Sequence, residues 1–151
     1  MGRNKTQKRG KGSVGANKKL SADFFAKNRK KPGIIETSTG LQYSIIDEGE
    51  GKRPTVDSEI TVNQRILLID GTIIKDTYKT GELDTFCLNE GIEGLKEGIP
   101  LMKCGARYKF FVPPDLAWGK RGAGNKIGPY ATLIFDIRLA RIFHKDFNIH
   151  T

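Results

Sequence analysis

The sequence predicts an α+β fold in which one short helix lies on an antiparallel sheet. Apolar and polar residues alternate over residues 131–142 and, less regularly, over 106–112, as expected of strands with one buried face. Asp70-Gly71 follows an apolar run and is a hairpin signal. Four apolar residues that precede the last strands recur at helical spacing: Ile92, Leu95, Ile99 and Met102.

The first fifth of the chain differs in composition from the rest. Residues 1–19 are rich in Gly, Asn and Lys and hold too few apolar side chains to form a core, so we expect this stretch to be disordered. Ser21 is a favourable N-cap and predicts a short helix over about residues 21–31, which Pro32-Gly33 ends. We therefore divide the chain into a basic extension at 1–32, a folded domain at 33–143 and a tail at 144–151.

Short strands open the folded domain. We expect them over residues 41–46, 60–69, 72–75 and 86–88, with the hairpin turn between the second and the third. The helix predicted over 91–102 contains Gly94, Gly98 and Pro100, all of which disfavour a helix. Tertiary packing must therefore hold this helix in place.

Pro113-Pro114 ends the first of the two long final strands, because proline lacks the N–H that a central strand needs. Trp118 is therefore expected on a glycine-rich loop that returns to the sheet near residue 131. The loop offers aromatic and branched apolar groups but almost no acid, base or nucleophile. An enzyme built this way would surround its substrate instead of attacking it.

Gln64 interrupts the inward-facing row of the strand at 60–69, whose other members are aliphatic. A buried amide without partners costs about 1–3 kcal/mol. Two interpretations stay open for Gln64. It braces a loop by hydrogen bonds, or it faces an apolar concavity that binds a ligand.

The net charge of +9 is concentrated in one part of the chain. Residues 1–31 hold 11 Lys and Arg but only one acid, Asp23, whereas the remaining residues are close to neutral. Three interpretations are open: a solvated leader, an arm that binds RNA or the ribosome through phosphate contacts, and attraction to an acidic membrane surface. Residues 1–19 contain no aromatic side chain for base stacking, so any nucleic-acid binding would be electrostatic.

Several classes of protein and site are not expected. No apolar run has signal-peptide or membrane length, so we expect a cytoplasmic protein with no membrane segment. Cys87 and Cys104 are expected to be small core residues in a reducing compartment. His144 and His150 lie in a tail without further ligands, so neither a metal nor another cofactor is predicted.

Several blocks of sequence, taken together, resemble one family. They are GLQY at 40–43, EGEGKRP at 48–54, DGT at 70–72, IEGLKEGIPLMKCG at 92–105, VPPDLAWG at 112–119 and ATLIFDIRL at 131–139. In this order and spacing they resemble the FKBP family of peptidyl-prolyl cis-trans isomerases, the macrolide-binding immunophilins. The lead-in before residue 43 is similar to that of bacterial members of the macrophage-infectivity-potentiator kind. The resemblance implies a bent antiparallel sheet wrapped around one short helix.

The resemblance also implies a proline-binding site between sheet and helix. It assigns catalytic positions to Trp118, to the backbone N–H of Ile92 and to Phe135. It assigns substrate contacts to two apolar residues, Leu95 on the floor and Ile127 on the wall. Three further substrate positions depart from the family pattern, which has Tyr, Phe and Asp where this chain has Gln64, Ile74 and Lys75.

The expected function is therefore isomerisation of X–Pro bonds during protein folding, with proline-containing polypeptides as partners. The alternative is a catalytically weak FKBP-fold binding or chaperone module, tethered to RNA or the ribosome by residues 1–31. Gln64, Ile74 and Lys75 favour that alternative. The dimerisation module of the infectivity-potentiator group is a long helical N-terminal region, which this sequence lacks, so we expect a monomer.

Overall fold

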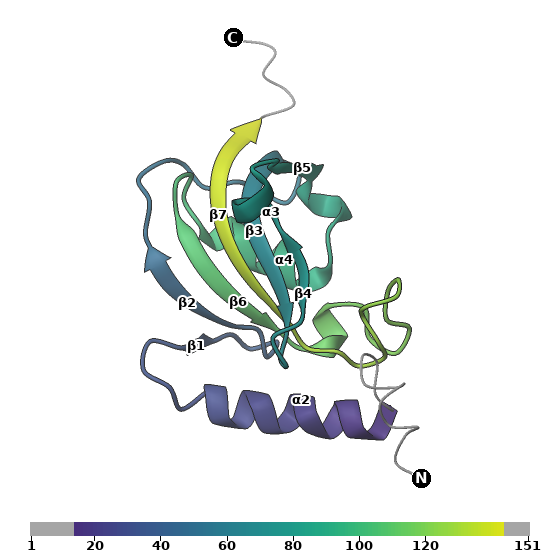
Figure 1. Ribbon diagram of the computed structural model, residues 1–151. Helices are drawn as coiled ribbons and strands as arrows, with labels where there is room; N and C mark the ends of the chain where they lie inside the picture. The colour runs from purple at the N-terminus through teal and green to yellow at the C-terminus, as the bar shows by residue number, and fades with distance from the viewer. Residues whose placement is uncertain (1–13, 144–151) are drawn as a thin grey trace.

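The computed structural model describes residues 14–143; residues 1–13 of the stretch expected to be disordered and the tail at 144–151 lie outside them. A seven-stranded antiparallel sheet forms the body (Figure 1). Six strands follow the order β1-β2-β6-β7-β3-β4, and β5 pairs with the other part of β3. The strands are β1 (Ile35–Glu36), β2 (Gln42–Asp47), β3 (Glu59–Leu68), β4 (Ile73–Asp76), β5 (Asp84–Cys87), β6 (Arg107–Val112) and β7 (Leu133–Phe143).

The helices are short apart from the first one. They are α2 (Val14–Asn28), α3 (Thr77–Thr80) and α4 (Glu93–Gly98), and single 3-10 turns occupy Leu88–Glu90, Ile99–Leu101 and Pro114–Leu116. The α+β fold class and the bent sheet around a short helix are confirmed. The helix predicted over 91–102 exists as α4 followed by the 3-10 turn at Ile99–Leu101.

The core lies between α4 and one face of the sheet. The inward row of β7 is fully or almost fully buried, as its alternation predicts. This row meets the inward residues of β6 and β3 and the apolar side of α4, with which it forms one cluster. Burial of such side chains contributes about 1.5–3 kcal/mol each. The inward residues of β7 are Leu133, Phe135, Ile137 and Leu139.

The N-terminal helix is longer than predicted and packs on the body. It begins at Val14, so residues 14–19 are helical and the disorder predicted for them is wrong. Ser21 lies inside α2 and is not its N-cap. The hydroxyl of Ser21 is buried and accepts a hydrogen bond from Thr132, 2.8 Å away. Figure 1 shows α2 running across the lower end of the sheet. The division of the chain at residue 32 stays a prediction.

Hydrogen bonds with Gln42 of β2 also hold α2 in place. The buried side chains of Asn28 and Gln42 are hydrogen-bonded at 2.8 Å, and Gln42 also donates to the Phe25 carbonyl.

Elsewhere, Cys87 and Cys104 are free thiols that are only partly buried, so their predicted placement in the core is wrong. No helix among residues 14–143 is both long and apolar enough to cross a bilayer.

Candidate functional site

Helix α4 lies very close to β6 because two of its residues have no side chain. A Cβ atom on Gly98 would be 2.5 Å from Phe110 Cε1, and one on Gly94 would be 2.6 Å from Val112 Cγ1. The glycines that weaken α4 as an isolated helix are therefore the residues that allow it to pack. This packing places Leu95, 5% exposed, in the core cluster.

Five of the predicted site residues come together around this helix. Leu95, Ile127 and Phe135 belong to the core cluster, and Ile74 and Ile92 are partly buried against it. They come from α4, from the loop before β7, from β7 itself, from β4 and from the residue that precedes α4. Residues from distant parts of the chain thus share one apolar cluster.

The loop between β6 and β7 is ordered by its own backbone. Ala123 and Ile127 form an isolated bridge of two hydrogen bonds, which closes a tight turn. Gly122 has φ +68°, and a Cβ there would collide with the Ile127 carbonyl oxygen, so only glycine fits. This turn directs Ile127 inward, where it is 7% exposed.

Trp118 differs from the other predicted residues because it is 38% exposed. The loop segment that carries it starts against α4, since a Cβ on Gly94 would be 3.3 Å from the Leu116 carbonyl oxygen. Trp118 therefore lies two residues after Leu116, whose carbonyl oxygen is close to α4. The residue before the helix, Ile92, has extended backbone, and no described residue accepts a hydrogen bond from its N–H.

A polar cluster lies at two of the positions where this chain departs from the family pattern. The Gln64 side chain is 6% exposed and donates from Nε2 to Asp84 Oδ2 at 2.8 Å, and Lys75 Nζ bonds to Asp84 Oδ1 at 2.7 Å. Gln64 therefore makes a bracing hydrogen bond, as one of its two interpretations expected, but to the strand β5 and not to a loop. Sequence analysis missed Asp84. This residue lies two positions before the half-buried Phe86 in a short strand and therefore shares its face.

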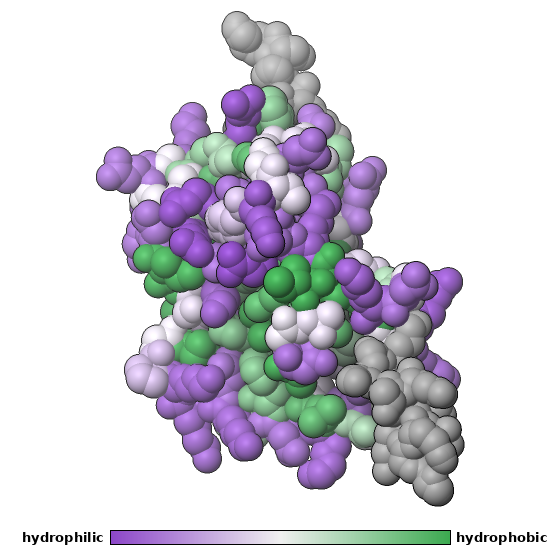
Figure 2. Space-filling view, viewed as in Figure 1, coloured by the Kyte–Doolittle hydropathy of each residue, from purple (hydrophilic) through white to green (hydrophobic). Residues whose placement is uncertain are grey.

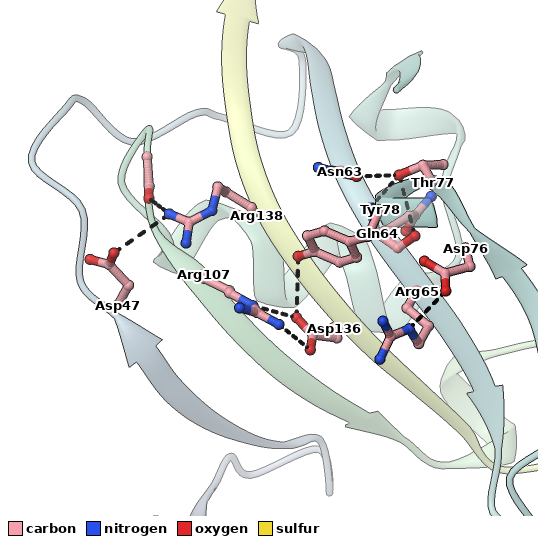
Figure 3. A network of polar contacts seen from close by, with 11 residues as sticks. Asp47, Asn63, Gln64, Arg65, Asp76, Thr77, Tyr78, Arg107, Asp136 and Arg138 are labelled. Atoms are coloured by element: carbon pink, nitrogen blue, oxygen red, sulfur yellow. Dashed lines mark hydrogen bonds and ion pairs between the residues drawn. The ribbon is translucent and has the colours of Figure 1, made fainter. Parts of the chain in front are cut away.

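The opposite face of the sheet carries a second polar network (Figure 3). Arg107 makes a two-pronged ion pair with Asp136 at 2.9 Å, and the Tyr78 hydroxyl donates to the same carboxylate at 3.2 Å. Burial alone would raise the pKa of Asp136, but the hydrogen bonds and charge of Arg107 bring it below its ordinary value. Burial raises the pKa of Tyr78 to about 12. This network fixes α3 on the sheet and lies away from the apolar cluster.

The molecule has two other notable surface features. A hollow of about 520 Å³ lies between α2 and Pro113-Pro114, and none of the predicted site residues lines it. Apolar surface also gathers over the end of β4, where Ile73 is exposed (Figure 2). Within the described residues no three His, Cys, Asp or Glu side chains form a metal-binding group, and His144 and His150 lie outside them.

Comparison with known proteins agrees with this arrangement. The model of the FKBP-type peptidyl-prolyl cis-trans isomerase family matches residues 50–140, and that of the domain amino-terminal to it matches 2–45. A probable FKBP-type isomerase of Neisseria meningitidis is 43% identical over 132 residues, which cover 87% of this chain and 48% of the relative. The Mip isomerase of Coxiella burnetii is 40% identical over 129 residues, covering 85% and 56%. The chain thus spans about half the length of these relatives.

Two solved structures share the fold. The crystal structure of FkpA from Escherichia coli superposes with a TM-score of 0.82 at 34% identity, covering 85% of this chain and 60% of that one. A peptidyl-prolyl cis-trans isomerase from Pseudomonas syringae gives 0.81 at 28% identity, covering 88% and 98%.

Proposed function

Because this chain belongs to the family of FKBP-type peptidyl-prolyl cis-trans isomerases, we propose that it catalyses rotation about X–Pro bonds in polypeptides during their folding. One observation carries the proposal. Leu95, Ile127 and Phe135 belong to one apolar cluster without an acid, base or nucleophile among them, and the loop that carries Ile127 also carries the exposed indole of Trp118.

This chemistry needs no reactive side chain. Rotation about a peptide bond must cross a barrier of about 18–20 kcal/mol that amide resonance sets. An X–Pro bond therefore isomerises over tens of seconds or more without a catalyst. The planar amide is more polar than the twisted one, so an apolar surface that excludes water disfavours the planar form. Shape complementarity to the twisted form adds differential binding.

The other site residues fit supporting roles. The N–H of Ile92 has no acceptor among the described residues and is free to hold a substrate carbonyl. The indole N–H of Trp118 is a second donor for a peptide carbonyl. Both donors would hold the chain on either side of the proline while its ring contacts Leu95 and Phe135.

An isomerisation assay on a proline-containing tetrapeptide tests the proposal. We expect the wild-type chain to accelerate isomerisation, and Trp118→Ala to lower kcat/KM by about tenfold, equivalent to about 1.4 kcal/mol of transition-state binding. Phe143→Ala is the matched control, because Phe143 at the far end of β7 is also 38% exposed. A wild-type rate equal to that of Trp118→Ala and of the buffer would refute the proposal.

We propose as the second candidate a weakly catalytic FKBP-fold module held on RNA or the ribosome. The polar cluster of Gln64, Lys75 and Asp84, together with the 11 cations of residues 1–31, favours it. The same assay separates the two, since for the weakly catalytic module the wild-type rate would not exceed that of Trp118→Ala. We also propose that the protein is cytoplasmic, which cell fractionation tests, and that it is a monomer, which light scattering tests.

A further inference from the structure

Gln64 is a polar residue inside an apolar row. It lies on β3 between Val62 and Ile66 on the face that packs against α4, and Ile137 of β7 is its partner across the ladder. Its backbone N–H donates to Thr77 Oγ1 at 2.7 Å, which fixes the strand at this point. The side chain is therefore held inward by the ladder and by α3.

The carboxylate of Asp84 determines which way the Gln64 amide points. Gln64 Nε2 donates to Asp84 Oδ2, and the other carboxylate oxygen accepts from Lys75. A flipped amide would set Oε1 against a carboxylate oxygen, and neither atom can donate a hydrogen bond. Residues from β3, β4 and β5 thus direct Oε1 away from Asp84.

The oxygen that remains has no partner. Gln64 Oε1 is buried and is the single buried side-chain oxygen or nitrogen among the described residues that makes no hydrogen bond. Buried polar atoms in folded proteins are almost always paired, so an orphaned acceptor calls for a donor from outside the chain.

The polar cluster borders the candidate site. Lys75 pairs with Ile66 across the ladder, and Ile66 pairs with Phe135. Cross-strand partners share a face, so Lys75, Ile66 and Phe135 form one row across the inner side of the sheet. A ligand on Phe135 is therefore close to Gln64 and its orphaned oxygen.

We propose that Gln64 determines specificity, with Oε1 accepting a hydrogen bond from the side chain of a residue next to the substrate proline. This rests on the proposed function. Every peptide has backbone N–H groups. An acceptor at this position can therefore distinguish between substrates only by bonding to a side chain. The Lys75 ammonium and the Asp84 carboxylate are already paired with each other, so the cluster has no net charge to attract an ionic side chain, which favours neutral donors. The preferred substrates are prolyl peptides with Ser, Thr, Asn or Gln beside the proline.

Four tetrapeptides that carry Thr or Val immediately before or after proline test the proposal. Thr and Val have nearly the same shape, so their ratio of kcat/KM reports the hydroxyl. We expect the wild-type chain to favour Thr about 3- to 10-fold at one of the two positions. Gln64→Leu should bring this ratio to one or below.

Two variants control for changes in the fold. Gln42→Leu removes another buried glutamine, on β2 and away from the site, and should keep the wild-type ratio. If Gln64→Leu does not fold, Asp84→Asn is the substitute, because a neutral partner frees the Gln64 amide to flip and should reduce the ratio. Thermal unfolding identifies variants that are folded.

The outcomes separate this inference from the proposed function. Equal rates for Thr and Val peptides at both positions of an active wild-type chain, or a preference that survives Gln64→Leu, would overturn the inference alone. If the chain shows no isomerase activity, peptide binding is measured instead, through the signal of its single tryptophan. Tighter binding of the Thr peptides than of the Val peptides, without any rate enhancement, would uphold the inference and overturn the proposed isomerase activity.

Discussion

Tyr78 shows how one side chain makes the stability of the fold depend on pH. Burial, assisted by the nearby Asp136 carboxylate, raises the pKa of Tyr78 to about 12, because a charged phenolate is disfavoured there. Since this pKa exceeds the value of about 10 in the unfolded chain, the contribution of Tyr78 to stability is complete below pH 10. It is lost as the pH rises towards 12.

We therefore expect Tyr78→Phe to reduce the alkaline destabilisation of the protein. Between pH 9 and pH 11 the wild-type free energy of unfolding should fall by about 1 kcal/mol more than that of the variant. Urea denaturation at the two pH values measures the difference. Tyr108, whose pKa burial also raises, is present in both proteins and cancels in the comparison. An equal fall in both proteins would contradict the assignment.

At the scale of elements, α4 depends on packing and not on helix propensity. Gly94 and Gly98 allow the helix to approach Val112 and Phe110 of β6. The resulting contact buries Leu95 and Ile99 against the sheet. The geometry of the candidate site therefore depends on the absence of two side chains.

Replacing Gly98 with Ala should destabilise the protein, although alanine is the better helix former. Propensity favours Ala by about 1 kcal/mol, but the added methyl group would overlap the ring of Phe110, at a cost of about 1–3 kcal/mol. Gly15→Ala in α2 is the matched control, since nothing lies within 4 Å of its added Cβ and only the propensity gain remains. In thermal unfolding, the melting temperature should fall for Gly98→Ala and rise for Gly15→Ala. A higher melting temperature for Gly98→Ala would disprove the packing argument.

The elements that sequence analysis identified correctly are those with strong periodicity. The strands β3 and β7 lie within two residues of their predicted bounds, because alternation over ten residues is a clear signal. Helix α2 was placed too late because Ser21 looks like a cap, whereas its partner Thr132 is 111 residues away in the sequence. Such long-range bonds leave no local pattern.

Local signals were also overlooked. Helix α3 begins after Asp76, whose side chain accepts from the Lys79 N–H, and ends at Gly81 in a left-handed conformation. Both are standard end signals of a helix and were available in the sequence. The apolar part of the candidate site could be assigned through the family blocks. Asp84 could not, because its contact with Gln64 appears only when β5 pairs with β3.

At the scale of the whole molecule, the basic N-terminal region and the body are connected by α2. Asn17 donates to the Pro129 carbonyl oxygen at 2.8 Å, and the Lys18 ammonium lies 4.6 Å from the centre of the Tyr130 ring. The beginning of α2 is thus fixed to the loop that precedes β7. Several of the cations on this helix and just after it are exposed: Lys18, Lys27, Lys30 and Lys31.

If residues 1–31 bind RNA, the affinity should fall steeply with salt. Deletion of residues 2–13 removes five of the 11 cations, and each phosphate contact contributes about −0.7 to the slope of log affinity against log salt for a single strand. The deletion should therefore make the slope shallower by up to about 3.5. Fluorescence anisotropy with an unstructured RNA from 50 to 200 mM salt, approximately the range over which such contacts weaken, measures it. Affinity that does not respond to salt would contradict an electrostatic arm, and an unchanged melting temperature is the control for the fold.

The attachment of α2 beside Tyr130 has a kinetic consequence. If the basic N-terminal region binds a polymer, α2 would hold that polymer beside the loop that carries Trp118. A client joined to that polymer would meet the indole at a local concentration that depends on the length of the intervening chain and not on its abundance in solution. Even a weak catalyst would then encounter each tethered proline many times before the client departs.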